Sequence, residues 1–340
     1  MNEPLLLIPF FVAIFLALNM GASGTAPAFA AAYGAKLIKK SSIPILFGLF
    51  VLLGAFLAGG KVSSTVGKEI LSSEFLNLQT TSIILLAVSI SLAFANWFKI
   101  PQSTSQATVF SVAACAIFYK SFEGNKLFVQ IIPAWFILPL VSFAFMLLVG
   151  KFLFKEKAED IEAQQKPRLP LVKLIVLVSS CYVAFAIGAN NVGNIVGPLA
   201  SMVKNQESFE AASLSFSLVT NIAVFIIAPY FGLGSAFLGS KVAKSTGRNI
   251  VRINPGEAVT IAILTASLLL FASVTEGIPS SLVQLNTGAI FGLAISKYGW
   301  RKVFNNHSNR VIWIVWFIAP LISFILTGLM LILARFIGLL

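Results

Sequence analysis

The sequence predicts an all-α polytopic membrane protein. We expect two inverted-topology repeats of about five crossings each, with broken or re-entrant helices and about 10 to 12 helices at about 20 residues a span. Of the 340 residues, 58% are hydrophobic and 11% are charged, whereas soluble domains have roughly 25% charged residues. The apolar runs are continuous, which favours helices over the alternating strands of a membrane barrel. A third observation is that the chain repeats itself.

Ten hydrophobic blocks follow one another, five on each side of a long polar segment. The first five cover residues 4–35, 44–59, 82–98, 103–119 and 129–154, and the second five cover residues 171–203, 211–238, 258–274, 282–296 and 311–339. The block that opens each half is longer than the roughly 20 residues of one span, so we expect it to break, tilt or turn back. The predicted units are a first repeat (1–154), a cytoplasmic linker (155–170) and a second repeat (171–340).

The two halves share sequence. The string Trp-Phe-Ile-x-Pro-Leu-x-Ser-Phe occurs at 135–143 and again at 316–324, and Ile-Pro occurs at 100–101 and 278–279. Such repetition indicates a tandem duplication. Because five crossings is an odd number, the second copy enters the membrane from the opposite side. Inverted repeats that meet at the membrane midplane are typical of secondary transporters.

The basic residues are distributed unevenly. The chain has 24 Lys and Arg against 12 Asp and Glu, a net charge of +12, and 18 of the 24 fall on one side of the predicted topology. Cytoplasmic loops collect Lys and Arg, so we expect a multi-pass protein of the cytoplasmic membrane with both termini outside and the linker inside. The charge therefore reports orientation in the lipid bilayer, and we expect no nucleic-acid partner.

Four polar strings interrupt the apolar blocks at equivalent places in the two halves. Free N–H groups at a helix start bind oxyanions, and Pro followed by Ser or Thr is typical of such a start. One such string alone would be ordinary capping at a membrane interface, but four paired strings favour one central anion site. The candidate substrate-binding residues are Ser23, Gly24, Thr25, Ser103, Thr104, Ser105, Gln106, Asn190, Asn191, Asn194, Ser280, Ser281 and Gln284.

Nothing in the sequence predicts an enzyme, a cofactor or a metal site. There is no metal-ligand cluster, no Ser/His/Asp constellation and no Walker-type glycine loop. Cys115 and Cys181 lie in apolar runs and are expected to be small core residues.

The string from Gly188 to Asn194 resembles the GxNDxAN signature of the inorganic phosphate transporter (PiT) family, and the string from Pro101 to Ser105 resembles its P-x-S-T-[ST]/H motif. The resemblance covers nearly the whole chain. Asn191 stands where the family usually has Asp, and the first copy has Ser23 and Gly24 where the family has Asn and Asp. This combination is similar to the sulfate permease branch, whose members are bacterial inner-membrane sulfate importers. The resemblance implies proton-driven symport and favours a homodimer.

The scarcity of aspartate supports sulfate as the substrate. Asp160, in the linker, is the only Asp in the chain. Phosphate at neutral pH carries a proton that a carboxylate can accept, whereas a buried carboxylate facing sulfate would be an unpaired like-charge contact. A site made of donors suits sulfate. The alternatives are a phosphate symporter with a degenerate cation site, an anion channel, and a membrane scaffold that transports nothing.

The coupling cation is expected to be a proton or, less favoured, sodium. The family's motif aspartates help to bind sodium, so their absence here argues against that kind of site. Asn190, Asn191 and Asn194 could still coordinate a cation, while Glu257 and Glu276, at the two ends of one crossing, are candidates to carry a proton. The alternative for both glutamates is a solvated loop position. Lys61 and its repeat equivalent Lys241 could attract the anion or simply flank a span.

Overall fold

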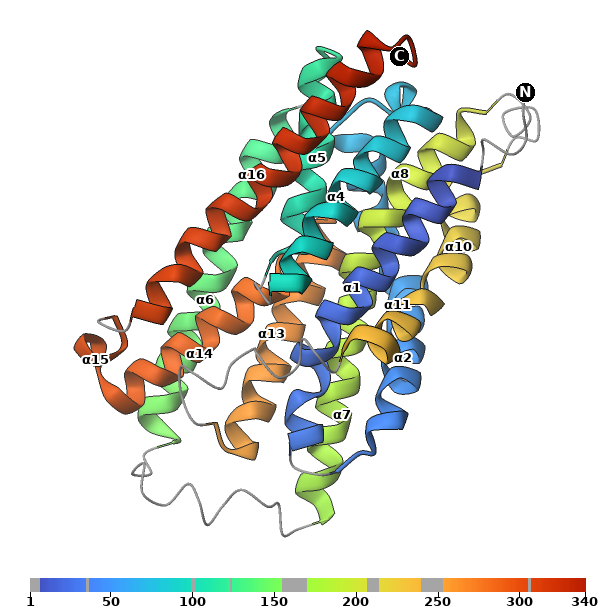
Figure 1. Cartoon of the computed structure of the whole chain (residues 1–340). Coiled ribbons are helices and arrows are strands. Elements are labelled where there is room, and N and C mark those ends of the chain that lie inside the picture. Colours follow the sequence, from blue (N-terminus) through green and yellow to red (C-terminus); the bar gives the residue numbers. More distant parts are fainter. Residues whose placement is uncertain are drawn as a thin grey trace.

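The computed structural model describes residues 7–34, 37–98, 102–122, 124–154, 170–206, 214–239, 253–304 and 307–340. Across these ranges the regular elements are helical (Figure 1). Each of the ten predicted blocks contains helix. In chain order they are α1 (Leu7–Gly34), α2 (Ile43–Ala58), α4 (Leu78–Phe98), α5 (Thr104–Phe118), α6 (Ile132–Phe152), α7 (Pro170–Ile187) with α8 (Gly193–Lys204), α10 (Phe216–Ile227) with α11 (Pro229–Gly234), α13 (Pro255–Thr275), α14 (Leu282–Tyr298) and α16 (His307–Phe336).

Short elements that the hydrophobic pattern did not predict join the long helices. They are α3 (Gly60–Ser64), the π-helical turns η3 (Thr65–Glu69), η5 (Lys126–Ile131) and η8 (Ser235–Gly239), and α15 (Trp300–Phe304). Within the described ranges, seven helical segments are long and apolar enough to cross a membrane. Many large apolar side chains on their outer faces are exposed, for example Phe136, Leu140 and Leu329, as a surface in contact with lipid requires.

The repeat-equivalent helices α5 and α14 are both shorter than the bilayer core. α5 has 15 residues and α14 has 17, so at about 1.5 Å per residue they span roughly 22 to 26 Å, against a core of about 30 Å. Figure 1 shows α5 and α14 running from the middle of the bundle toward opposite ends. These repeat-equivalent half-helices therefore begin deep inside the protein.

Each half-helix packs against the last long helix of the other repeat: α5 against α16, and α14 against α6. The Ser142 hydroxyl on α6 donates to the Leu285 carbonyl on α14 at 2.9 Å, and Trp135 Nε1 donates to the Pro279 carbonyl at 2.9 Å. On the other side, the Ser111 hydroxyl on α5 lies 2.6 Å from the Thr327 hydroxyl on α16. The surroundings of each half-helix therefore include residues of both repeats.

The start of α1 and the end of α16 are at one end of the bundle, while the end of α6 and the start of α7 are at the opposite end (Figure 1). This arrangement agrees with two halves that each have an odd number of crossings. The linker residues 155–169 lie outside the described residues, so the boundaries of the predicted units stay predictions.

The first block was expected to break, tilt or turn back, and it does not break at residues 21–27. α1 is one continuous helix that includes Pro27. A proline inside a helix removes one backbone hydrogen bond, and here the helix continues with buried small residues on both sides. The hydroxyls of Ser23 and Thr25 donate to carbonyls of the same helix, Met20 O at 3.1 Å and Gly21 O at 2.7 Å. Proline is tolerated in membrane helices because neighbouring groups satisfy the local backbone.

The corresponding string in the second half forms a π-helical turn. α7 continues through η7 (Gly188–Val192) into α8 without leaving the helical conformation. Such turns accommodate one extra residue and occur often at functional sites. Gly188 is required here because its Cα faces the Val51 carbonyl of α2 so closely that a Cβ would collide with it. The string Gly188 to Asn194 thus bulges into the protein without exposing a free helix end.

Candidate functional site

The starts of α5 and α14 are capped as the sequence predicts. Ser103 Oγ accepts a hydrogen bond from the Gln106 N–H at 3.3 Å, and Ser281 Oγ accepts one from the Gln284 N–H at 3.3 Å. The first turn of each helix still has N–H groups that no intrahelical carbonyl can satisfy, at the positive end of the helix dipole. Two equivalent anion-attracting helix starts therefore lie within the protein.

Gln106 and Gln284 join these two helix starts. Their amides form a reciprocal pair, with Gln106 Nε2 3.3 Å from Gln284 Oε1 and Gln284 Nε2 3.2 Å from Gln106 Oε1. Both side chains are buried. The expectation that equivalent residues of the two repeats converge is therefore met for this pair.

Ser105 connects α5 to the π-helical turn. Its hydroxyl lies 2.9 Å from the Asn190 side chain and accepts from Asn194 Nδ2 at 3.0 Å. The surrounding network orients the Asn190 amide: its nitrogen faces Ser105 Oγ, Asn191 Oδ1 (3.0 Å) and the Ser280 carbonyl (2.9 Å), and its oxygen faces the Ser280 N–H (3.0 Å). In this orientation Ser105 accepts two amide hydrogen bonds, and among the residues that the structure describes none accepts its own proton.

Ser273, near the end of α13, also belongs to this network. Its hydroxyl lies 2.9 Å from the Asn190 side chain. Sequence reasoning missed Ser273, because a single serine in an apolar helix is common and its hydroxyl can bond to its own helix, as Ser273 also does to the Leu269 carbonyl at 2.8 Å. The one feature of the sequence that could have indicated Ser273 is its position, as a polar residue close to the end of a predicted span.

These residues form what we call the amide-hydroxyl cluster: Ser103, Thr104, Ser105, Gln106, Asn190, Asn191, Asn194, Ser273, Ser280, Ser281 and Gln284. All of them are less than 9% exposed. None is a carboxylate or an ammonium group. Two of its buried atoms, Ser280 Oγ and Asn194 Oδ1, have no hydrogen-bond partner within the part of the chain that the structure describes. Since buried polar atoms are normally paired, both mark places where a ligand, an ion or water would bind.

The first polar string does not join the cluster. Ser23 and Thr25 bond to their own helix, and Gly24 faces the side chains of Phe47 and Ile187. Thr25 also lies against Gly239 of η8, and among the described residues no hydrogen bond connects these three residues with the cluster. Their proposed role in binding stays a prediction.

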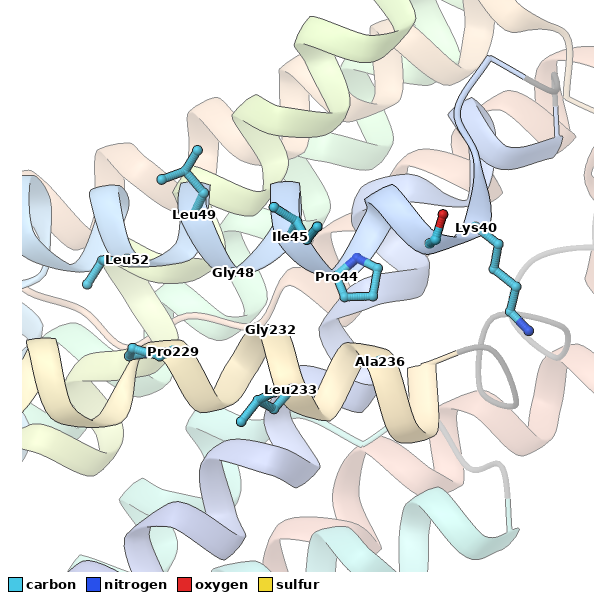
Figure 2. A pocket seen from close by; sticks show the side chains of 11 residues that line it. Lys40, Pro44, Ile45, Gly48, Leu49, Leu52, Pro229, Gly232, Leu233 and Ala236 are labelled. Atoms are coloured by element: carbon cyan, nitrogen blue, oxygen red, sulfur yellow. The ribbon is translucent and has the colours of Figure 1, made fainter.

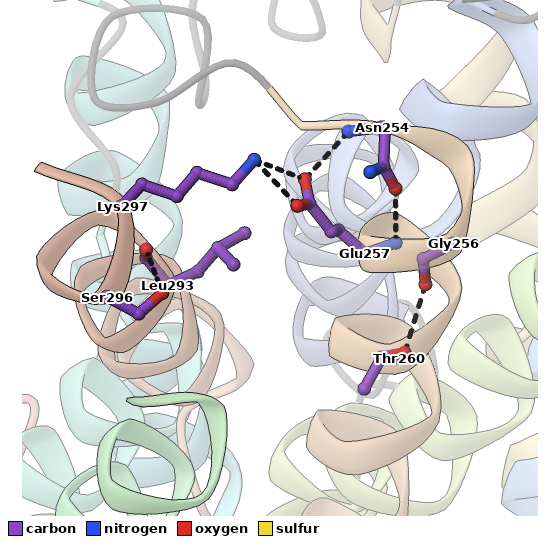
Figure 3. Close-up of polar contacts among 7 residues, drawn as sticks. All are labelled: Asn254, Gly256, Glu257, Thr260, Leu293, Ser296 and Lys297. Carbon is purple, nitrogen blue, oxygen red and sulfur yellow. Dashed lines mark hydrogen bonds and ion pairs between the residues drawn. The ribbon is translucent and has the colours of Figure 1, made fainter. Parts of the chain in front are cut away.

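Glu257 is not the solvated loop acid that was the alternative for it. It lies in the first turn of α13, 1% exposed, in a capping box with Asn254. Its carboxylate pairs at 2.6 Å with Nζ of Lys297, which lies near the end of α14 (Figure 3). Glu257 is sixteen residues from Ser273 along α13, or about 24 Å at 1.5 Å per residue. It is therefore far from the cluster.

Glu276, at the other end of α13, is exposed. Its backbone carbonyl accepts from Lys126 Nζ at 2.9 Å, and the Thr275 carbonyl accepts from Lys61 Nζ at 2.8 Å. Two lysines from the first repeat thus neutralise the negative end of the α13 dipole. Lys61 thus does more than flank a span, because it binds the Thr275 carbonyl. Its repeat equivalent Lys241 lies outside the described residues.

Among the described residues, no group of three or more His, Cys, Asp and Glu side chains is close enough to hold a metal ion. Cys115 and Cys181 are buried and unpaired with each other. Apart from the buried Glu257–Lys297 ion pair, the polar groups of the described interior that surround the cluster are amides, hydroxyls and backbone N–H groups.

Comparison with known proteins identifies the family. The model of the phosphate transporter family matches residues 20–327. The chain belongs to this family. Sulfate permease CysP of Bacillus subtilis (strain 168) is 32% identical over 311 residues, which cover 91% of this chain and 82% of the permease. Members of the phosphate transporter family are transporters and not enzymes, and this chain is accordingly an anion transporter of the membrane.

A solved member confirms the fold of this phosphate transporter family protein. The structure described as the sodium-dependent phosphate transporter superposes with a TM-score of 0.77 at 19% identity, covering 98% of this chain and 100% of that one. At this identity the likeness shows the architecture alone. The all-α polytopic fold predicted from the sequence is confirmed.

Proposed function

We propose that this protein imports sulfate across the bacterial cytoplasmic membrane by cation-coupled alternating access, with the amide-hydroxyl cluster as its anion site. The observation that supports this most is the meeting of two half-helix starts with Asn190 and Asn194 in a buried place that contains donors and no carboxylate. An oxyanion there would be held by N–H and O–H groups at the positive ends of two dipoles.

Sulfate is favoured over phosphate because the cluster residues include no carboxylate. Hydrogen phosphate has a proton to donate, and a carboxylate would be its strongest acceptor, whereas sulfate only accepts. The acceptors of the cluster are neutral amide, hydroxyl and carbonyl oxygens. Asn191, where the family usually has Asp, supplies an amide in place of a carboxylate. The similarity to a protein named sulfate permease points the same way. Phosphate remains the second substrate, because the family model is that of phosphate transporters.

The burial of the cluster supports alternating access. Every member is nearly inaccessible to solvent, so an anion held there is occluded from both sides. A continuous channel would need an open path past the same residues. We therefore propose rocking or gating of one repeat against the other around the fixed site.

The proton is the proposed coupling ion, because the chain lacks the aspartates of a family-type sodium site. One observation favours sodium as the second candidate. Asn194 Oδ1 is a buried acceptor without a partner in the described structure, and amide oxygens are suitable ligands for hard cations. Asn190 and Asn191 lie beside it in the same helical turn.

Uptake of radiolabelled sulfate into proteoliposomes tests this proposal. Separate inward gradients of H⁺ and Na⁺ are imposed, and unlabelled phosphate competes. We expect accumulation against the sulfate gradient only under an imposed H⁺ gradient, with competition by phosphate at least tenfold weaker than by sulfate. Accumulation driven by Na⁺ would identify the second candidate ion. Equilibration without accumulation would indicate a channel, and stronger competition by phosphate would indicate a phosphate symporter.

A further inference from the structure

A groove of about 940 Å³ runs along the outer surface between α2 and α11, away from the amide-hydroxyl cluster (Figure 2). Its walls are apolar over most of their length. Ile45 and Leu49 of α2 are 72% and 48% exposed, and Leu233 of α11 is 46% exposed. The lining residues are Lys40, Ser41, Pro44, Ile45, Gly48, Leu49, Leu52, Pro229, Gly232, Leu233 and Ala236.

Two glycines form the floor of the groove. A Cβ on Gly48 would lie 3.0 Å from the Gly232 Cα, and a Cβ on Gly232 would lie 3.0 Å from the Pro44 carbonyl oxygen. The two helices approach closely there because neither residue has a side chain. The space above the glycines is consequently open to the surface and bordered by the larger apolar residues on each side.

One end of the groove is polar and positively charged. Lys40 and Ser41 are exposed and lie in the short 3-10 turn (Lys40–Ser42) that leads into α2. Lys39 directly precedes this turn and is exposed as well. The start of α2 adds the positive end of its dipole. By the distribution of basic residues, this end belongs to the cytoplasmic face.

We propose that this groove binds one anionic phospholipid of the cytoplasmic leaflet, with an acyl chain between α2 and α11 and the phosphodiester at Lys40. The groove runs from Ser41, in the 3-10 turn, to Leu52 of α2, eleven residue steps or about 16 Å at 1.5 Å per residue. That length matches one leaflet of a hydrocarbon core about 30 Å thick. The positive end of the groove matches the anionic head group of a phospholipid, and its apolar walls match an acyl chain.

A second copy of the chain is the other occupant to consider. The groove has eleven lining residues, whereas a stable protein interface uses roughly 20 to 30 residues on each side. The small number of lining residues favours a single acyl chain.

The test is the binding of phosphatidylglycerol and of phosphatidylcholine with the same acyl chains, measured by native mass spectrometry and by thermal shift on the purified full-length protein. We expect phosphatidylglycerol to bind more tightly to the wild type. Lys40→Gln should weaken phosphatidylglycerol binding about fivefold, the effect of about 1 kcal/mol per lysine at an anionic lipid surface, and leave phosphatidylcholine binding unchanged. Ala236→Phe should fill the groove and weaken both lipids.

The matched controls are Lys151→Gln, an exposed lysine at the end of α6, and Ala31→Phe, an exposed alanine of α1. Both should bind phosphatidylglycerol as the wild type does. Equal binding of the two lipids, or equal loss in Lys40→Gln and Lys151→Gln, would overturn the proposal. Conversion of a dimer to a monomer by Ala236→Phe would assign the groove to a second copy and overturn it as well.

Discussion

The Ser105 hydroxyl is one of the contacts between the two repeats at the proposed anion site. It lies within 3.0 Å of side chains from both Asn190 and Asn194, and in the assigned orientation no described residue accepts its proton. Replacing it removes a donor from the site and leaves two amides partly unpaired. An unpaired buried polar group costs about 1 to 3 kcal/mol.

Ser105→Ala should therefore reduce sulfate uptake, as the ratio of maximal rate to half-saturating concentration, at least tenfold. Ser111→Ala is the matched control: it lies on the same helix, and its buried hydroxyl bonds to Thr327 at 2.6 Å instead of to the cluster. Both variants should lose similar thermal stability. Equal uptake by the two variants would remove Ser105 from the site.

Asn191→Asp tests the selectivity argument at a single atom. Restoring the family's usual residue places a carboxylate in a site of donors, so sulfate binding should weaken at least tenfold while phosphate binding weakens less. Equilibrium binding of both anions to the purified variant measures this. An unchanged sulfate-to-phosphate ratio would show that Asn191 does not face the anion.

At the scale of single residues, the sequence predicted much of the site and missed its partners. Ser103 and Ser281 cap the helices they were predicted to start, because capping depends on neighbours in the chain. Ser273 and Lys297 were missed because their partners, Asn190 and Glu257, are 83 and 40 residues away. Such contacts depend on tertiary packing, which local patterns do not specify.

The helices α13 and α14 meet the cluster where α13 ends and α14 begins, and an ion pair joins the start of α13 to the end of α14. Glu257 and Lys297 pair at 2.6 Å, with side-chain exposures of 1% and 7%. Removing one partner from a buried pair leaves an uncompensated charge and costs about 3 to 5 kcal/mol. Replacing both partners avoids that cost.

Lys297→Met should accordingly lower the melting temperature of the detergent-purified protein by several degrees. The double variant Glu257→Gln/Lys297→Met should recover most of the loss. Lys302→Met, which removes an exposed lysine stacked 5.2 Å from the Tyr298 ring centroid, is the control and should change stability little. A double variant no more stable than Lys297→Met would contradict a simple charge-pair account.

At the scale of elements, the hydrophobic pattern predicted where helices form and misjudged how the longest ones continue. All ten blocks became helix. The glycine, serine and proline residues of 21–27 appeared to break α1, yet the helix continues because its small residues are buried against α11 and α2. Packing of that kind offsets a weak local preference for helix.

The whole molecule places both chain ends on one side and the ends next to the linker on the other (Figure 1). Which side is cytoplasmic is predicted from the excess of Lys and Arg. A cysteine at Lys151 should react with a membrane-impermeant maleimide only from the cytoplasmic side, and a cysteine at Leu339 only from outside. Cys115 and Cys181 are buried, so the background should be low. The reverse labelling pattern would invert the proposed orientation.

The central claim is that a buried site of donors, without a carboxylate, selects an anion that has no proton. The most direct test is equilibrium binding of radiolabelled sulfate to the purified wild-type protein, competed by phosphate at neutral pH without any ion gradient. The structure predicts that sulfate binds at least tenfold more tightly, a difference of about 1.4 kcal/mol. Phosphate binding equal to or tighter than sulfate would contradict it.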